Sequence, residues 1–343
     1  MLNLLGGSSF QYLARGCKNP GAKLRQATGD FFFLGLGDKR LERGDRGVKM
    51  QVEDVNEVPT HVFTQKSSVK NRTLLLIVPG SPGMGHFYIP FATRLFRLGG
   101  GAYDVSVVSH AGHSPGFAKP ESSGDPGGRN WYDLDDQIYH KMAYIEQQAA
   151  DKDALYLVGH SIGCYMVLKM LKHLTPEKVK KAILLFPTIE KMALTPNGKS
   201  LSPLFTTFRY PFMGAVWLLS NFPDTVRRFV LGQYFYTTPQ EHLEHIILGA
   251  MNIDGKSIYN ILCMANQEMQ EVADLPEQII HENIGKLVFY YGQEDKWNTK
   301  SCYEDMAKRF PGKDVNLCKN GYPHAFVETS ADEVADFVYS KLL

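Results

Sequence analysis

Ser161, Asp295 and His324 are the residues whose types and order along the chain could carry out nucleophilic catalysis. Ser161 stands at the centre of Gly159-His160-Ser161-Ile162-Gly163, directly after the apolar run 154–158. A serine between glycines at a strand-to-helix turn is held in a strained backbone conformation, with its hydroxyl projecting outward. We therefore predict that Ser161 is a nucleophile, activated by a histidine base that a carboxylate orients.

The expected partners of Ser161 both fall in loops. Asp295 follows the β-branched and aromatic run 286–291, which predicts a buried strand that ends in a loop. His324 lies in the short stretch 321–326, ahead of a helix predicted over 331–342. Loops after parallel strands carry the chemistry of such sheets, and serine, acid, histidine is the chain order of α/β-hydrolases.

Two other carboxylates compete with Asp295 for the role of the acid. Glu294 is its neighbour, and Glu190 follows the strand-like run 182–186. Glu190 is a rival because the acid can follow a different strand on this scaffold. We expect Asp295 to be the acid.

The backbone N–H groups of Ser81 and Ile162 are the predicted oxyanion hole, which binds the negative charge that develops on an attacked carbonyl. The run 73–78 is the most apolar strand expected in the chain, and it leads into Pro79-Gly80-Ser81-Pro82-Gly83. Glycines in this turn let the backbone approach a ligand closely. Ile162 directly follows the nucleophile.

Several short motifs together resemble those of the lipid droplet-associated hydrolase family, and the similarity runs from about residue 70 to the C-terminus. Gly-x-Ser-x-Gly is generic to serine hydrolases, but the combination of the motifs is narrow. They are Pro79-Gly80-Ser81-Pro82-Gly83, Ser109-His110-Ala111-Gly112-His113, Gly159-His160-Ser161-Ile162-Gly163, Leu185-Phe186-Pro187-Thr188-Ile189-Glu190, Pro196-Asn197-Gly198, Tyr290-Tyr291-Gly292 with Asp295 and Trp297, and Pro323-His324-Ala325-Phe326.

This resemblance implies a serine lipid hydrolase at lipid droplets and on the cytosolic face of the endoplasmic reticulum. Ester substrates, cholesteryl esters among them, are the implied class, with Ser161 as nucleophile, Asp295 as acid and His324 as base. The mechanism requires no metal and no organic cofactor. Two alternatives stay open: an acyltransferase that uses the same triad, and a catalytically weak scaffold protein of the lipid droplet.

Length and composition limit the fold and the partners that the chain can have. At 343 residues with 44% hydrophobic content, the chain is long enough for one large core. We expect a single α/β-hydrolase domain over residues 50–343, with a mostly parallel central sheet, helices on both faces and a helical, apolar lid insertion. A net charge of +1 and the lack of a basic cluster argue against nucleic acid as a partner. Five widely spaced cysteines are typical of reduced thiols.

Two segments allow more than one interpretation. His110 and His113 have a spacing that could suggest a metal site, but no carboxylate cluster lies near them in the sequence, so we expect a loop that borders the active-site cleft. Residues 1–49 begin without acidic residues, as mitochondrial transit peptides do, but we expect a disordered extension.

The lid is expected at about residues 188–285. Its most apolar part is 205–236, and the segment 211–222 within it is too short to be a simple transmembrane helix, which needs about 20 apolar residues. The alternatives are a lid packed on the core and a lid whose aromatic face enters one lipid leaflet. We favour the second, with Arg209, Arg227 and Arg228 near the headgroups. The predicted membrane contacts are Phe212, Met213, Trp217, Leu218 and Leu219.

Overall fold

The computed structural model describes residues 50–68, 72–114, 116, 119 and 129–342. The extension expected over residues 1–49 lies outside the described residues, as does Cys17. The other four cysteines are buried free thiols.

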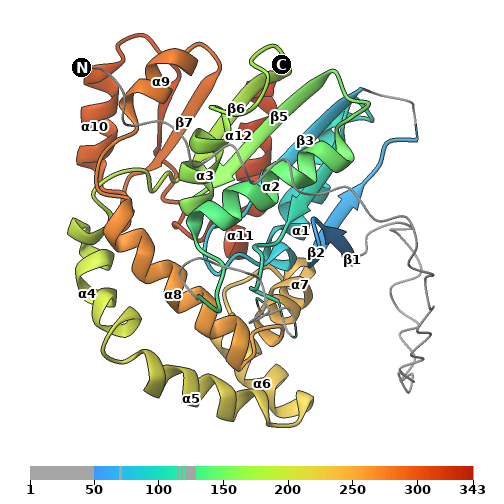
Figure 1. The fold of residues 1–343 in the computed structure, drawn as a ribbon, viewed down its shortest axis with the longest axis vertical. Coiled ribbons are helices and arrows are strands. Elements are labelled where there is room, and N and C mark those ends of the chain that lie inside the picture. Colours follow the sequence, from blue (N-terminus) through green and yellow to red (C-terminus); the bar gives the residue numbers. More distant parts are fainter. Residues whose placement is uncertain (1–49, 69–71, 115, 117–118, 120–128, 343) are drawn as a thin grey trace, which may run out of the picture. The chain divides into compact units, whose positions relative to one another are not determined.

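The central element is a sheet of eight strands in the order β1-β2-β4-β3-β5-β6-β7-β8 (Figure 1). Strands β3 to β8 run parallel to their neighbours, whereas β1 and β2 form an antiparallel hairpin whose second strand pairs antiparallel with β4. The strands are β1 (Met50–Val55), β2 (Val58–Gln65), β3 (Thr73–Val78), β4 (Asp104–Val108), β5 (Ala154–His160), β6 (Val179–Leu185), β7 (Leu287–Gly292) and β8 (Val315–Cys318).

Helices cover both faces of this sheet. On β3, Leu74 and Leu76 face one core together with α2, α3, α9 and α10, while Leu75 and Ile77 face the other together with α1, α7, α11 and α12. This alternation follows from the period of two along a strand. The mostly parallel, doubly covered sheet confirms the predicted fold class.

The helices alternate with the strands from β3 to β6, and several successive helices then follow before β7. They are η1 (Gly85–Tyr88), α1 (Ile89–Gly99), α2 (Leu134–Gln148), α3 (Ile162–Met170), η2 (Met192–Leu194), α4 (Pro196–Phe205), α5 (Arg209–Ser220), α6 (Asp224–Tyr234), α7 (Gln240–Met251), α8 (Gly255–Glu271), α9 (Glu277–Asn283), α10 (Lys300–Arg309), α11 (Phe326–Thr329) and α12 (Ala331–Leu342). The segment from η2 to α9 separates β6 from β7, where we expected the lid.

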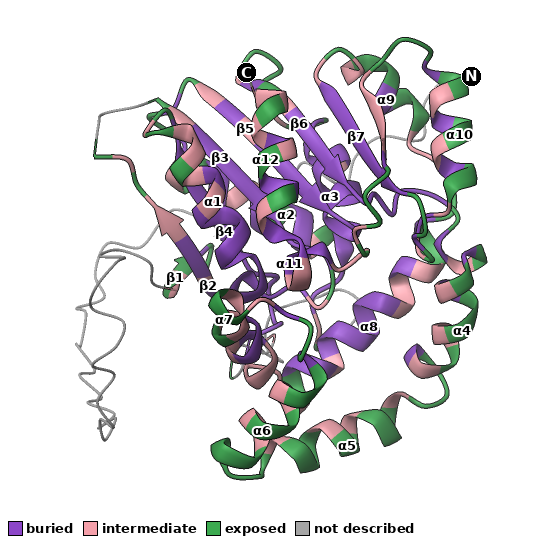
Figure 2. Ribbon diagram, turned by 180° about the vertical axis from the view of Figure 1, so that it is seen from behind, coloured by how far each residue is buried: buried purple, intermediate pink, exposed green. Residues whose placement is uncertain are grey.

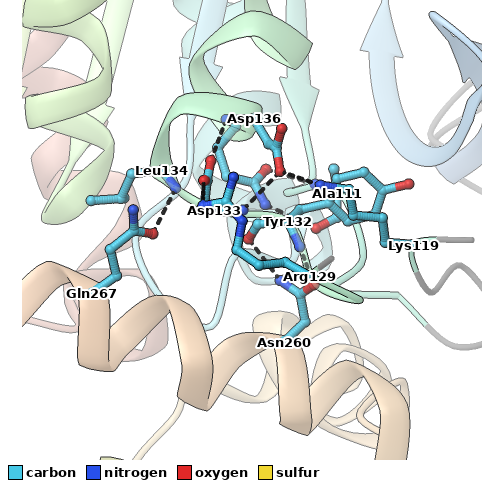
Figure 3. A network of polar contacts seen from close by, with 10 residues as sticks. Ala111, Lys119, Arg129, Tyr132, Asp133, Leu134, Asp136, Asn260 and Gln267 are labelled. Atoms are coloured by element: carbon cyan, nitrogen blue, oxygen red, sulfur yellow. Dashed lines mark hydrogen bonds and ion pairs between the residues drawn. The ribbon is translucent and has the colours of Figure 1, made fainter. Parts of the chain in front are cut away.

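Within this segment, α8 is joined to the sheet domain by side-chain hydrogen bonds. Side-chain amides of α8 form hydrogen bonds with the backbone at the start of α2 (Figure 3). The Asn260 Oδ1 accepts the Tyr132 N–H at 2.7 Å, and its Nδ2 donates to the Tyr132 carbonyl at 3.2 Å. The Gln267 Oε1 accepts the Leu134 N–H at 3.0 Å. Helix α8 is therefore a fixed base for the helices around it.

The start of α2 is defined by a capping box, shown in the same view (Figure 3). The Asp133 carboxylate accepts the Asp136 N–H at 2.8 Å, and the Asp136 carboxylate accepts the Asp133 N–H at 3.1 Å. These bonds satisfy N–H groups that have no partner inside the helix. One turn later, Gln137 pairs through its amide with both backbone groups of Ala111.

We predict that Asn260→Leu lowers the free energy of unfolding by about 1–3 kcal/mol, because both buried backbone groups of Tyr132 lose their partner. Urea denaturation monitored by circular dichroism measures this. Asn320→Leu, at an exposed position, is the matched control and should change stability by less than about 0.5 kcal/mol. Equal effects of the two substitutions would contradict the role of Asn260 as an anchor.

Candidate active site

Ser161 lies in a strained turn between β5 and α3. Its backbone adopts φ 53° and ψ −124°, a positive φ that residues with a side chain rarely adopt. The turn also needs close packing: a Cβ on Gly163 would lie 2.3 Å from the Val78 carbonyl oxygen, and a Cβ on Gly80 would lie 2.7 Å from the Ser161 Cβ. The tight approach of β3 to this turn explains the small residues.

Ser161, His324 and Asp295 are hydrogen-bonded in a line. His324 Nε2 lies 2.9 Å from Ser161 Oγ, and His324 Nδ1 lies 2.6 Å from Asp295 Oδ2. Because a carboxylate only accepts, the Nδ1–H donates to Asp295, and in the neutral ring Nε2 is then free to accept the serine hydroxyl. The structure thus brings together all three residues singled out from the sequence.

The three residues come from loops after three parallel strands. Ser161 follows β5, Asp295 follows β7 and His324 follows β8. Parallel strands end at the same edge of a sheet, so their following loops meet there. Asp295 and His324 therefore reach Ser161 although they are far from it in the chain.

Asp295 is fixed by its own loop. Its Oδ1 accepts the N–H groups of Trp297 at 2.7 Å and Asn298 at 3.1 Å, which leaves Oδ2 for His324. Asn298 in turn donates through Nδ2 to the Pro187 carbonyl, in the loop after β6. The Asp295 side chain is only 1% exposed, whereas that of His324 is 17% exposed.

Neither rival carboxylate is bonded to His324. Glu190 is paired with Lys191 Nζ at 2.9 Å, and Glu294 is exposed. Among the described residues, Asp295 carries the only carboxylate that contacts the His324 ring.

The turn Pro79–Gly83, which contains Ser81, lies directly against Ser161. The Gly80 N–H is taken by the Tyr88 hydroxyl at 2.7 Å, whereas the Ser81 N–H has no hydrogen-bond acceptor among the described residues. Ile162 is the first residue of α3, so its N–H belongs to the first turn, where helix N–H groups have no intrahelical partner. Neither predicted donor is thus used by a hydrogen bond among the described residues, and their role as an oxyanion hole stays a prediction.

The Ser109–His113 loop supports the Pro79–Gly83 turn through hydrogen bonds. The His110 N–H donates to the Gly83 carbonyl at 2.7 Å, and the His113 Nδ1–H donates to the Pro82 carbonyl at 2.8 Å. The Ser109 hydroxyl accepts the Gly85 N–H at 2.9 Å. In the described part of the chain, no group of histidine, cysteine, aspartate and glutamate side chains is arranged to hold a metal ion.

Tyr88 and His160 also belong to the site, although the sequence did not identify them. His160 Nδ1 lies 2.6 Å from the Tyr88 hydroxyl, and His160 Nε2 lies 2.8 Å from the His324 carbonyl oxygen. The only signal for His160 was its place beside Ser161. Tyr88 comes from η1, and no motif marks it.

Several histidines around the site are neutral because they are buried. Desolvation lowers the pKa of His86 to about 4 and that of His113 to about 3. It holds the pKa of His110 and His160 well below the ordinary value of 6.5. His113 and His160, whose side chains form hydrogen bonds with the loops around Ser161, are thus uncharged.

Known proteins match the chain at two levels. Residues 71–327 match the family model described as lipid-droplet associated hydrolase. The lipid droplet-associated hydrolase of Homo sapiens is 36% identical over 300 residues, covering 82% of this chain and 88% of the relative, and that of Drosophila melanogaster is 30% identical over 299 residues, covering 83% and 95%.

Solved structures are similar in fold at low sequence identity. E-2-(acetamidomethylene)succinate hydrolase matches with a TM-score of 0.58 at 14% identity, covering 86% of this chain and 99% of the other. An esterase from Exiguobacterium antarcticum matches with a TM-score of 0.53 at 14% identity, covering 86% and 98%. These similarities show the α/β-hydrolase fold, as predicted, and the fold alone.

We predict that the free energy of unfolding falls as the pH drops below about 6.5. Unfolded histidines take up a proton near 6.5, whereas folded His86 stays neutral down to about pH 4, so acid favours the unfolded state between these values. The stabilisation is fully present above 6.5 and is lost toward pH 4. His86→Gln should reduce the slope of unfolding free energy against pH by up to about 1.4 kcal/mol per pH unit.

Urea unfolding at a series of pH values measures that slope. His281→Gln, at an exposed position, is the control and should leave it unchanged. A slope for His86→Gln equal to that of the wild type would show that His86 does not contribute.

Proposed function

The chain belongs to the lipid droplet-associated hydrolase family, and we propose that it is a serine hydrolase that cleaves lipid esters at the lipid droplet surface. The observation that carries this proposal is the Asp295–His324–Ser161 line, with contacts of 2.6 and 2.9 Å and a defined proton direction. Cholesteryl esters are the candidate substrates, and the cytosolic face of the endoplasmic reticulum is the candidate second location.

The proposed mechanism has two halves. His324 Nε2 accepts the Ser161 proton as Oγ attacks the ester carbonyl, and the N–H groups of Ser81 and Ile162 hold the resulting oxyanion. His324 then gives the proton to the departing alcohol oxygen, which leaves an acyl group on Ser161. Water, deprotonated by His324, attacks this acyl-enzyme, and His324 returns the proton to Ser161 Oγ as the fatty acid leaves. Asp295 keeps the imidazole oriented and stabilises its charged form throughout. This chemistry calls for no metal and no organic cofactor.

The helices α5 and α6 support a lipid surface as the place of action. Neither helix has a buried residue, and both stand out as exposed and half-exposed in Figure 2. Single exposed apolar residues are ordinary, but a run along two successive helices marks an interaction site. We call the exposed large apolar side chains here the lid surface: Phe208, Tyr210, Phe212, Trp217, Leu218, Leu219, Phe222, Val226, Phe229, Val230, Tyr234 and Tyr236.

Met213, one of the predicted membrane contacts, lies on the face of α5 that packs against α8. Met213 and Val216 pack against the cluster of α8 and Phe205, because residues three apart share a face of a helix. Met213 is therefore left out of the proposed lipid contact, whereas Phe212, Trp217, Leu218 and Leu219 remain in it. An open pocket of about 580 Å³ lies between α5 and the start of α8.

The arginines near the lid are engaged within the protein. Arg209 donates to the Phe205 carbonyl at 2.8 Å, Arg227 donates to the Met251 carbonyl at 2.5 Å, and Arg228 is paired with Glu244 at 2.8 Å. The expectation that these cations lie near lipid headgroups stays a prediction, and the proposed contact of the lid surface is mainly apolar. No helix in the described ranges combines the length and apolar character needed to cross a bilayer.

We predict that Ser161→Ala abolishes both ester turnover and covalent labelling by a fluorophosphonate probe. Asp295→Asn should lower kcat by about 10⁴-fold. The backbone N–H groups on Oδ1 would hold the amide oxygen in place and direct the NH₂ group at His324, which forces the wrong ring tautomer.

Labelling intensity and release of fatty acid from emulsified esters measure these effects. Glu294→Gln, at the exposed neighbour, is the matched control and should keep wild-type activity. Labelling that persists in Ser161→Ala, or an Asp295→Asn variant as active as Glu294→Gln, would refute the assignment.

We predict that Leu218→Asp lowers binding to artificial lipid droplets by about tenfold or more, since each inserted large apolar side chain contributes roughly 1.5–3 kcal/mol. Flotation of droplets covered by a neutral phospholipid monolayer measures the bound fraction. Tyr139→Asp is the matched control, because Tyr139 is 58% exposed, as Leu218 is, but lies on α2. Equal flotation of the two variants would exclude the lid surface as the contact.

A further inference from the structure

Two buried side chains connect the loops that surround Ser161. Tyr88, from η1, and His160, which directly precedes Ser161, are 3% and 4% exposed. Tyr88 contacts the turn after β3, and His160 contacts the loop after β8. Together they form a hydrogen-bonded chain from Gly80 through Tyr88 and His160 to the backbone of His324.

The direction of every hydrogen bond in this chain follows from its ends. The His324 carbonyl can only accept, so His160 Nε2 carries the proton and donates at 2.8 Å. Burial lowers the pKa of His160 well below its ordinary value, so the ring is neutral and its Nδ1 is an acceptor. The Tyr88 hydroxyl therefore donates to Nδ1 at 2.6 Å and accepts the Gly80 N–H at 2.7 Å.

This arrangement removes His160 as a possible base and fixes its ring. Both of its ring nitrogens are occupied by hydrogen bonds. The ring also packs against Phe326 at 4.9 Å and Phe186 at 6.2 Å between centroids, both edge to face. Its role must therefore be exerted through the groups that it holds.

Each end of the chain holds a part of the proposed machinery. At one end, the peptide of Gly80 precedes Ser81, whose N–H is the proposed oxyanion donor. At the other end, the carbonyl belongs to His324, whose ring is the proposed base. The side chain of His324 is held by Asp295, but its backbone is held by His160. The distance between donor and base thus depends on two buried side chains.

We propose that Tyr88 and His160 are positioning residues that fix the Ser81 N–H and the His324 imidazole relative to Ser161. This inference rests on the proposed serine-hydrolase function. A displacement of catalytic groups by about 1 Å can cost about 100-fold in rate, and loss of an oxyanion donor costs at least as much. Neither residue belongs to the lid surface, so the lipid contact should not depend on them.

The test compares Tyr88→Phe with Tyr103→Phe. Both substitutions remove one hydroxyl from a buried tyrosine. Tyr103, however, precedes β4 at the amino end of the parallel strands, and its hydroxyl donates to the Leu95 carbonyl of α1. Hydrolysis of p-nitrophenyl butyrate gives kcat and KM, and fluorophosphonate labelling counts the active serines. We expect Tyr88→Phe to lower kcat per labelled serine by about 10- to 100-fold, with KM within about twofold of the wild type.

His160→Gln and His160→Ala form a second comparison. The glutamine amide can still donate to the His324 carbonyl, so His160→Gln should retain more kcat per labelled serine than His160→Ala. A role in folding alone would lower the fraction of protein that can be labelled but would leave the rate per labelled serine unchanged.

The outcomes separate this inference from the function on which it rests. A wild-type rate no higher than that of Ser161→Ala would remove the proposed function and the inference with it. An active wild type with equal kcat per labelled serine in Tyr88→Phe and Tyr103→Phe would overturn the inference alone.

Discussion

The rest of the site depends on the strained turn at Ser161. A positive φ at a residue with a side chain persists only where the surrounding structure holds it. Here β3 and its turn approach so closely that Gly80 and Gly163 have no room for a Cβ. The same approach that imposes the strain places the Ser81 N–H beside the serine. One packing constraint thus fixes both the proposed nucleophile and the turn that carries the proposed oxyanion donor.

Acceptor-only groups then determine where the protons lie. The Asp295 carboxylate requires a proton on Nδ1 of His324, and the His324 carbonyl requires one on Nε2 of His160. Two neighbouring histidines therefore have opposite tautomers and different tasks. Burial keeps His160 and the histidines behind the Pro79–Gly83 turn uncharged, so they act as hydrogen-bonding supports.

The insertion between β6 and β7 divides its apolar residues between two uses. The apolar residues of α8 form a core with Phe205, and its side-chain amides bond to the backbone at the start of α2. Helices α5 and α6 leave most of theirs exposed, and an exposed apolar surface of this extent marks an interaction site. A fixed base with an apolar outer surface suits an enzyme whose substrate is dissolved in a lipid phase.

The sequence alone predicted the fold class, the main strands and the grouping of Asp295, His324 and Ser161. These features leave signals in the sequence itself: glycine spacing, apolar runs and the order of residues along the chain. It favoured Asp295 but left Glu190 and Glu294 as rival acids, missed Tyr88 and His160, and placed Met213 on the lipid side. Only the tertiary structure decided these points. Which carboxylate reaches His324, which hydroxyl meets His160 and which face of α5 packs on α8 all depend on distances between segments far apart in the chain. A linear pattern carries no such distances, since they arise only when the strands align and their loops meet at one edge.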